Sequence, residues 1–210
     1  MRCVSFQLNL RNTIMNTFTA NILAVYDTAT KAELRHGLTW YEQAKQEAQA
    51  IADTTELPLR VVVGVIAALS PTNLWEQNLK DAALFCETFV NGGYYSDVKA
   101  STYKKMWEKA WTILEAVPAD DEAVAVILNG PKITDFFYCI MGYNVCVIDG
   151  HAWGIANNDR RVMQEVPNIG KRARIEMQEA YKEAGAQVGL TAYQMQATTW
   201  VIWRRAHGIK

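Results

Sequence analysis

The sequence predicts an all-α protein, and two observations support this class. Long stretches are rich in Ala, Glu, Gln, Lys, Leu and Met, which favour helix, whereas the 210 residues include only 5 Pro and 12 Gly. Apolar residues recur at helical spacing along most of the chain, and no internal repeat or low-complexity linker interrupts them. A chain of this length forms one large domain or two small lobes that share a core.

The first half of the chain shows the clearest helix signals. A long amphipathic helix is expected over residues 28–53, and Gly37 leaves open whether it is interrupted. Pro58 suits the first turn of the next helix, over residues 59–69. Because this second helix is apolar on nearly every face, we expect it at the centre of the core. It ends before Pro71, since the residue before a proline avoids the helical conformation.

The rest of the chain continues the helical pattern, with turns marked by Asn, Gly and Pro. Residues 144–148 are expected to be extended and to lead to Asp149. Further helices are expected over residues 74–90, 102–116, 121–128, 132–141, 150–157, 171–184 and 191–207.

Composition excludes several classes of protein. Half of the residues are hydrophobic and a fifth are charged, which argues against a disordered chain. The longest apolar run, residues 61–69, is about half of what a membrane-spanning helix needs, and no secretory signal is apparent, so we expect a cytoplasmic protein without a membrane partner.

The four cysteines and three histidines are scattered, which predicts buried thiols and no metal site; the cysteines are Cys3, Cys86, Cys139 and Cys146.

Charge is unevenly distributed around the net value of −1. Residues 1–150 carry 12 Lys and Arg against 17 Asp and Glu, whereas residues 151–210 carry 9 against 5. The basic C-terminal part permits an anionic partner without requiring one.

A lysine and an aspartate carry the strongest chemical signal. Residues 127–132 (ILNGPK) predict two helices joined by a tight turn, with Lys132 at the start of the second helix, where amide groups and the helix dipole favour a phosphate. Asp149 follows seventeen residues later, after one helix and one extended segment. A ten-residue helix spans roughly 15 Å, and the extended segment can retrace that length, so the two side chains could face each other across one cleft. An amine and a carboxylate so placed suit covalent chemistry at an electrophilic carbon.

Three segments, in this order, resemble the helix-hairpin-helix DNA glycosylase superfamily, which includes endonuclease III and 8-oxoguanine glycosylase. They are residues 67–73 (AALSPTN), residues 130–132 (GPK) and residues 146–156 (CVIDGHAWGIA). The resemblance covers about residues 35–157. It departs from the family pattern at Leu128, where the hairpin usually has a glycine, and in lacking the C-terminal four-cysteine iron–sulfur motif.

The resemblance implies a two-lobed fold without an iron–sulfur cluster. Residues 38–143 would form a helical barrel lobe that ends in the hairpin. Residues 1–37 and 144–210 would form the other lobe, with the catalytic cleft between the two. Lys132 would be the nucleophile and Asp149 the catalytic carboxylate, with His151 a candidate to position the aspartate. Duplex DNA would be the partner of a monomer without a cofactor, and the candidate DNA-binding residues are Ser70, Thr72, Asn73, Asn129, Gly130, Lys171 and Arg172.

The resemblance implies a DNA glycosylase, with or without AP-lyase activity, that flips a modified or damaged base out of the duplex for DNA repair. One alternative is a phage DNA-modification enzyme of the same fold that joins an amine or amino acid to an activated thymine derivative. Another is a catalytically inactive DNA-binding module.

Each candidate residue also has a structural interpretation. Asp149 could cap the helix that begins at Gly150, Lys132 could be a solvated lysine, and His151 could be a core histidine. The turn at residues 71–73 could simply end a helix, with Asn73 the alternative candidate for insertion into DNA. Residues 166–171 (VPNIGK) also resemble a hairpin turn. Four tryptophans fit a core better than a base-stacking surface, namely Trp75, Trp153, Trp200 and Trp203.

Overall fold

The computed structural model describes residues 16–209, which form α-helices and two short 3-10 helices without a β-strand in that range. This confirms the all-α class. The elements are α1 (Thr17–Tyr26), α2 (Lys31–Thr55), α3 (Leu59–Leu69), α4 (Trp75–Val90), η1 (Tyr95–Asp97), α5 (Lys104–Ala116), α6 (Asp121–Leu128), α7 (Pro131–Met141), α8 (Gly150–Asn157), η2 (Met163–Glu165), α9 (Lys171–Gln187) and α10 (Ala192–Ala206).

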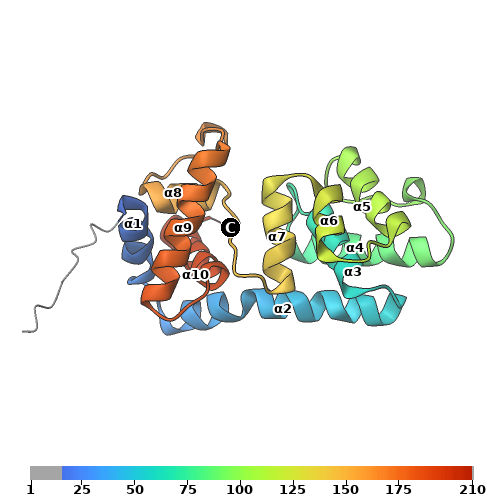
Figure 1. Cartoon of the computed structure of the whole chain (residues 1–210), viewed down its shortest axis with the longest axis horizontal. Coiled ribbons are helices and arrows are strands. Elements are labelled where there is room, and N and C mark those ends of the chain that lie inside the picture. Colours follow the sequence, from blue (N-terminus) through green and yellow to red (C-terminus); the bar gives the residue numbers. More distant parts are fainter. Residues whose placement is uncertain (1–15, 210) are drawn as a thin grey trace, which may run out of the picture.

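The helices form two groups, and α2 runs along one side of both (Figure 1). One group contains α3 to α7 and is called the central lobe here; the other contains α1, α8, α9 and α10 and is called the terminal lobe. α2 packs against α10 in the terminal lobe and against α3, α4 and α7 in the central lobe. The predicted boundary between residues 37 and 38 therefore falls within one continuous helix.

α2 is not interrupted at Gly37. Its start is fixed by a capping box, in which Thr30 and Glu33 exchange hydrogen bonds between side chain and backbone. A β-carbon built on Gly37 would lie 2.3 Å from the Cα of Thr198 in α10. The glycine is therefore present because two helix backbones approach closely at this point, and not because the helix breaks there.

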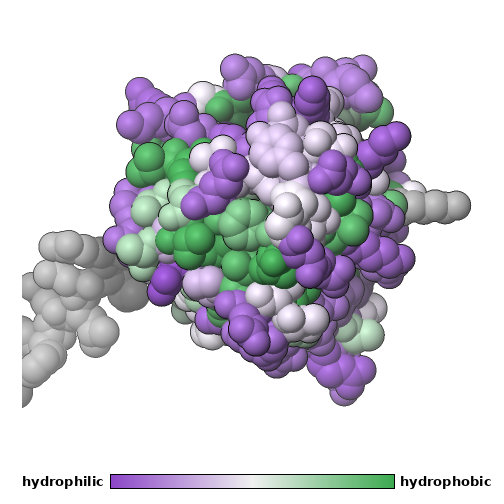
Figure 2. Space-filling view, turned by 90° about the vertical axis from the view of Figure 1, so that its right-hand side faces the viewer, coloured by the Kyte–Doolittle hydropathy of each residue, from purple (hydrophilic) through white to green (hydrophobic). Residues whose placement is uncertain are grey.

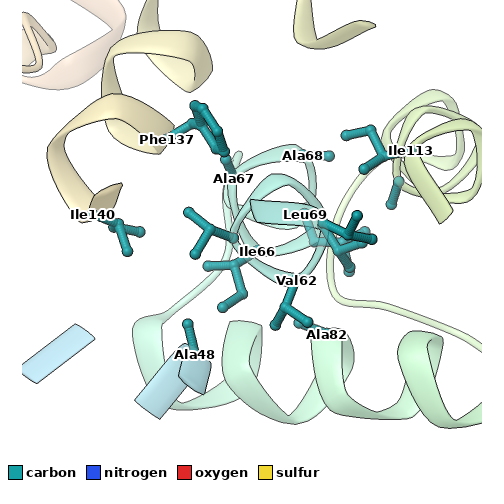
Figure 3. Packing of buried hydrophobic residues seen from close by; sticks show 14 of the residues in the cluster. Ala48, Val62, Ile66, Ala67, Ala68, Leu69, Ala82, Ile113, Phe137 and Ile140 are labelled. Atoms are coloured by element: carbon teal, nitrogen blue, oxygen red, sulfur yellow. The ribbon is translucent and has the colours of Figure 1, made fainter. Parts of the chain in front are cut away.

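The core of the central lobe surrounds α3, as the apolar sequence predicted. Every residue of α3 from Val61 to Leu69 is buried. Figure 3 shows side chains of four neighbouring helices around α3. These side chains are Ala48 of α2, Ala82 of α4, Ile113 of α5, and Phe137 and Ile140 of α7.

The terminal lobe has its own hydrophobic cluster, formed by segments from both ends of the described chain. Ile22 of α1 packs with residues of α8, α9 and α10, and Tyr181 is fully buried. The prediction of buried thiols is confirmed for Cys86, Cys139 and Cys146; Cys3 lies outside the described residues. Burial raises the pKa of the Cys86 thiol to about 12, so this thiol stays protonated at neutral pH.

The structure adds one helix and corrects one turn. α1 had no clear signal in the sequence. Residues 166–170 do not join two helices by a tight turn; they begin with a bend, have no regular secondary structure and connect η2 to α9. The helix–turn–helix pattern at residues 127–132 does fold as predicted, with α6 and α7 separated by Asn129 and Gly130.

The end of the central lobe that α4, η1 and α5 form is rich in exposed apolar side chains. Figure 2 views this end and shows hydrophobic residues gathered in its middle with hydrophilic residues around them. The large exposed apolar side chains in this region are Leu84, Val90, Tyr94, Tyr103 and Val117.

Replacing Gly37 with Ala tests the close approach of α2 and α10. We expect Gly37→Ala to lower the free energy of unfolding by about 1–3 kcal/mol, because the new methyl group meets backbone atoms that cannot rotate away. Urea denaturation would measure the loss. Gly170→Ala is the control, since a β-carbon there meets nothing within 4 Å and the φ angle is −66°. Equal stability of the two variants would contradict the close contact.

Candidate active site

A pocket of about 350 Å³ lies where the α3–α4 loop meets α2, α4, α7, α8 and α10. Five of the candidate catalytic and DNA-binding residues line it, although they come from three separate segments of the chain. They are Ser70, Asn73, Lys132, Asp149 and His151. The other lining residues are Trp40, Tyr41, Leu74, Trp75, Asn78, Phe136, Val147, Gln196, Ala197, Trp200, Arg204 and Ile209.

The turn between α6 and α7 places Lys132 at the pocket. Asn129 takes a left-handed conformation at the end of α6, with φ 41°. Gly130 is extended and Pro131 opens α7, so Lys132 is the second residue of that helix. No side chain caps the start of α7. The exposed lysine therefore stands beside backbone amides at the positive end of a helix.

Asp149 is held in a defined orientation by the helix that follows it. Its Oδ1 accepts hydrogen bonds from the backbone amides of His151 at 3.0 Å and Ala152 at 2.9 Å. The structure thus confirms that Asp149 caps α8. Both bonds use the same carboxylate oxygen, and the described part of the chain gives no hydrogen bond to Oδ2.

His151 lies among the charged side chains of the pocket. Partial burial lowers the pKa of its imidazole, and the positive charges of Lys132 and Arg204 lower it further. The carboxylate of Asp149 acts in the opposite direction. Because the pKa lies below its ordinary value of 6.5, the imidazole is uncharged at neutral pH.

The loop between α3 and α4 has one side chain held inward and one exposed. The amide nitrogen of Asn73 donates to Asp81 at 2.8 Å and to the carbonyl of Leu69 at 3.4 Å. Leu74, the next residue, is 78% exposed and lines the pocket. Thr72 is exposed with φ 61°, and it does not line the pocket.

Aromatic rings form much of the pocket wall. Trp40 lies 5.1 Å from Trp75 between ring centroids, and Trp75 lies 6.2 Å from Phe136. Trp200 lies across the pocket on α10, where the guanidinium of Arg204 stacks over its ring at 4.6 Å.

The expectation that the tryptophans are core residues holds for Trp203, which is 7% exposed. It holds in part for Trp75 and Trp153, which are partly buried against the hydrophobic clusters, although Trp75 also lines the pocket. It is wrong for Trp200, which is partly exposed and lines the pocket. Helical spacing marks an apolar face, but it does not tell whether that face meets another helix or a cavity.

Lys171 and Arg172 lie at the start of α9, away from the pocket lining. Both are exposed, and Arg172 forms an ion pair with Glu176 at 2.8 Å within the same helix. No side chain caps the start of this helix. Asn129 and Gly130 also lie outside the pocket lining, at the turn that leads to Lys132.

A polar bridge connects α7 and α9 behind the pocket. Gln178 donates to Asp135 at 3.0 Å and to the carbonyl of Cys146 at 3.1 Å. Arg174 lies 4.0 Å from Asp135 and donates to the carbonyl of Ile148, the residue before Asp149. The bridge therefore fixes the extended segment that delivers Asp149.

Neither a metal centre nor a membrane span is found in residues 16–209. No group of three or more His, Cys, Asp or Glu side chains there is arranged to hold a metal ion. No helix there is long and apolar enough to cross a membrane.

A family model described as a family of unknown function (DUF7178) matches residues 7–207. The chain belongs to this family. No curated protein and no solved structure matches it. These comparisons do not test the resemblance to DNA glycosylases, which stays a prediction.

Asp135 provides a pH test of the bridge. Burial raises the pKa of this carboxyl to about 6, despite the opposing effects of Arg174 and Gln178. Because the folded-state pKa is the higher one, the stability that protonation of Asp135 contributes is fully present below pH 3.8 and is lost as the pH rises through 6.

At pH 7.5 we expect Asp135→Asn to be more stable than the unmodified protein, with a free energy of unfolding up to about 3 kcal/mol higher. This advantage should shrink as the pH falls to about 4, where the carboxyl of Asp135 becomes protonated. Urea denaturation at several pH values would measure it. The exposed Asp53→Asn variant is the control. A pH-independent difference between Asp135→Asn and the unmodified protein would contradict the raised pKa.

Proposed function

We propose that this DUF7178 member is a DNA base-processing enzyme, a DNA glycosylase with AP-lyase activity that acts on a nucleotide flipped out of the duplex. The observation that carries the proposal is that Lys132 and Asp149 line one pocket with aromatic walls, although they come from different segments of the chain. The sequence resemblance assigns the same two residues the nucleophile and carboxylate roles.

Lys132 supplies the nucleophile in this mechanism. After Lys132 gives up a proton, its Nζ attacks C1′ of the flipped nucleotide while the glycosidic bond breaks, and the departing base takes up a proton. A proton moves from the nitrogen to O4′ as the C1′–O4′ bond breaks, which opens the sugar ring and gives a protonated Schiff base between Lys132 and C1′. Loss of a proton from C2′ and departure of the 3′-phosphate then form a C2′–C3′ double bond and cleave the strand.

Asp149 stabilises the positive charge that develops on the sugar as the base leaves. Its Oδ1 is occupied by the amides at the start of α8, which orients the carboxylate. Its Oδ2 can then face the sugar ring. His151 lies beside both charged residues and, being uncharged at neutral pH, leaves the attraction between Asp149 and the sugar undiminished.

The rings and the volume of the pocket suit a nucleobase. Aromatic faces stack with any base, and at about 350 Å³ the pocket lies at the small end of the ligand-site range of roughly 300–1,000 Å³.

Backbone amides and basic side chains supply the contacts to the DNA strands. The uncapped start of α7, after Asn129 and Gly130, offers amides to a phosphate next to the flipped nucleotide. Arg204 at the pocket, and Lys171 and Arg172 at the start of α9, add positive charge. We expect binding to weaken with added salt.

Leu74 is the residue that we assign to insertion into the duplex. Apolar side chains are used as wedges between base steps, and Leu74 is exposed at the pocket. Asn73, the candidate from the sequence, has its amide nitrogen bonded to Asp81 and Leu69. Insertion of Asn73 would break these bonds, whereas insertion of Leu74 breaks none.

Borohydride trapping tests the nucleophile. With duplexes that carry an abasic site or one of several altered bases, we expect a covalent protein–DNA adduct that is lost in Lys132→Ala and kept in Lys80→Ala. Lys80 is an exposed lysine of α4 that does not line the pocket. Asp149→Asn should release base at least about 100-fold more slowly while still binding DNA. An adduct that persists without Lys132, or unaltered base release without the Asp149 carboxylate, would contradict the mechanism.

Nucleoside mass spectrometry separates the neighbouring possibilities when no adduct forms. Free base without an adduct would indicate that water, and not Lys132, attacks the sugar. An altered nucleoside with its glycosidic bond intact would replace the glycosylase with a base-modifying transferase.

Duplex and single-stranded substrates test the wedge. We expect Leu74→Ala to lower the rate of base release from duplex DNA about tenfold or more, because the flipped state loses the side chain that fills the gap in the stack. Release from a single strand should change little, since no base pair has to open. The ratio of the two rates is the measurement, and a loss of equal size on both substrates would argue against insertion.

A further inference from the structure

The pocket wall formed by the α3–α4 loop and α4 contains two buried hydrogen-bond acceptors without a partner. They are Oδ1 of Asn73 and Oδ1 of Asn78. Both residues line the pocket, and Asn78 is only 1% exposed. Buried side-chain oxygens normally accept a hydrogen bond, so a pair of unpartnered oxygens at one pocket points to a ligand.

The donors of this region are already used. The amide nitrogen of Asn78 donates to the carbonyl of Ile66 at 3.0 Å, which fixes its orientation. The amide nitrogen of Asn73 donates to Asp81. Asp81 also accepts from Gln77 at 2.7 Å and from the backbone amide of Ser101 at 2.7 Å. The network is thus satisfied except at the two amide oxygens, which belong to residues that line the pocket.

We propose that this wall of the pocket recognises an amino group on the substrate, the exocyclic amine of an adenine-type or cytosine-type base. An amide oxygen only accepts hydrogen bonds, so it attracts an N–H group and disfavours the carbonyl of a uracil-type or hypoxanthine-type base. The inference rests on the base-binding pocket of the proposed function and names the class of base that it takes.

The charges of the pocket favour a base amine over a free alkylamine. Lys132 and Arg204 line the same pocket and repel an alkylammonium ion, although Asp149 attracts one. A base amine is uncharged and lies in the plane of an aromatic ring, which suits the ring walls at Trp40, Trp75 and Phe136.

The test uses nucleoside pairs that differ only by the amino group. 2′-Deoxyadenosine is compared with purine 2′-deoxyriboside, and 2′-deoxycytidine with 2-pyrimidinone 2′-deoxyriboside. Binding is followed by titration calorimetry. We expect the amino compound of one pair to bind about tenfold or more tightly than its partner, because the partner leaves both oxygens unpaired.

Equal binding within both pairs would overturn the proposal, as would absence of binding by all four nucleosides at millimolar concentration. Binding of putrescine, an alkylamine, without discrimination within either pair would also overturn it, since the acceptors would then serve a free amine.

Asn78→Leu assigns the discrimination to the orphan oxygen. Leucine has nearly the same size without an acceptor, so the preference for the amino compound should fall below about threefold. Asn91→Leu is the matched control, because Asn91 is exposed at the end of the same helix. Retention of the full preference in folded Asn78→Leu would contradict the assignment to this residue. If that variant does not fold, the nucleoside pairs on the unmodified protein still decide the proposal.

The binding test is independent of catalysis. Lys132→Ala protein should keep the amino preference, because the lysine does not form the acceptor wall. Selective binding without base release would leave this inference standing and count against the proposed function. Base release without a preference for the amino compound in binding would overturn this inference and support the proposed function.

Discussion

The close crossing of α2 and α10 at Gly37 and Thr198 is the constraint on which the rest of the structure depends. α2 is a single helix of 25 residues that contacts both lobes, so its contact with α10 sets how the lobes face each other. Trp40 and Tyr41, one turn beyond Gly37, lie on one wall of the pocket, and Gln196 and Trp200, on either side of Thr198, lie on another. A side chain at residue 37 would separate these walls. The pocket thus owes its width to the absence of one β-carbon.

A second constraint is that the polar groups around the pocket serve the fold and the site together. Asp149 caps α8, and the same hydrogen bonds orient its carboxylate. Arg174 and Gln178 of α9 hold the carbonyls of Ile148 and Cys146, the extended segment that ends at Asp149. The structural and catalytic interpretations of Asp149 therefore do not compete. A helix cap is one way to fix a carboxylate without neutralising it.

The elements that the sequence predicted well are those that local chemistry determines. Pro58, Pro71 and the Asn129–Pro131 turn mark helix ends through their own backbone preferences, and these ends agree with the structure. A glycine is needed at position 37 because Thr198, 161 positions away, packs against it, so no local pattern could show the reason. The same holds for Trp75 and Trp200, whose apolar spacing is that of a core face. The sequence pointed to Lys132 because it follows a sharp turn, and to Asp149 because an extended segment could bring it back to the lysine, whereas Leu74 and Asn78 lacked such a signal.

The α3–α4 loop shows why the pocket and its rim cannot be considered separately. Asn73 and Leu74 are neighbours, yet one has its amide nitrogen bonded to Asp81 and the other is 78% exposed. A leucine inserted into a duplex would be anchored through Asn73 to the network that orients the acceptors of the pocket wall. Displacement of the loop by a poorly fitting base step would disturb those acceptors as well. Under the proposed function, opening of the DNA duplex and recognition of the extruded base are therefore coupled through Asn73 and Leu74. The base is recognised best when the side chain of Leu74 is fully inserted into the duplex.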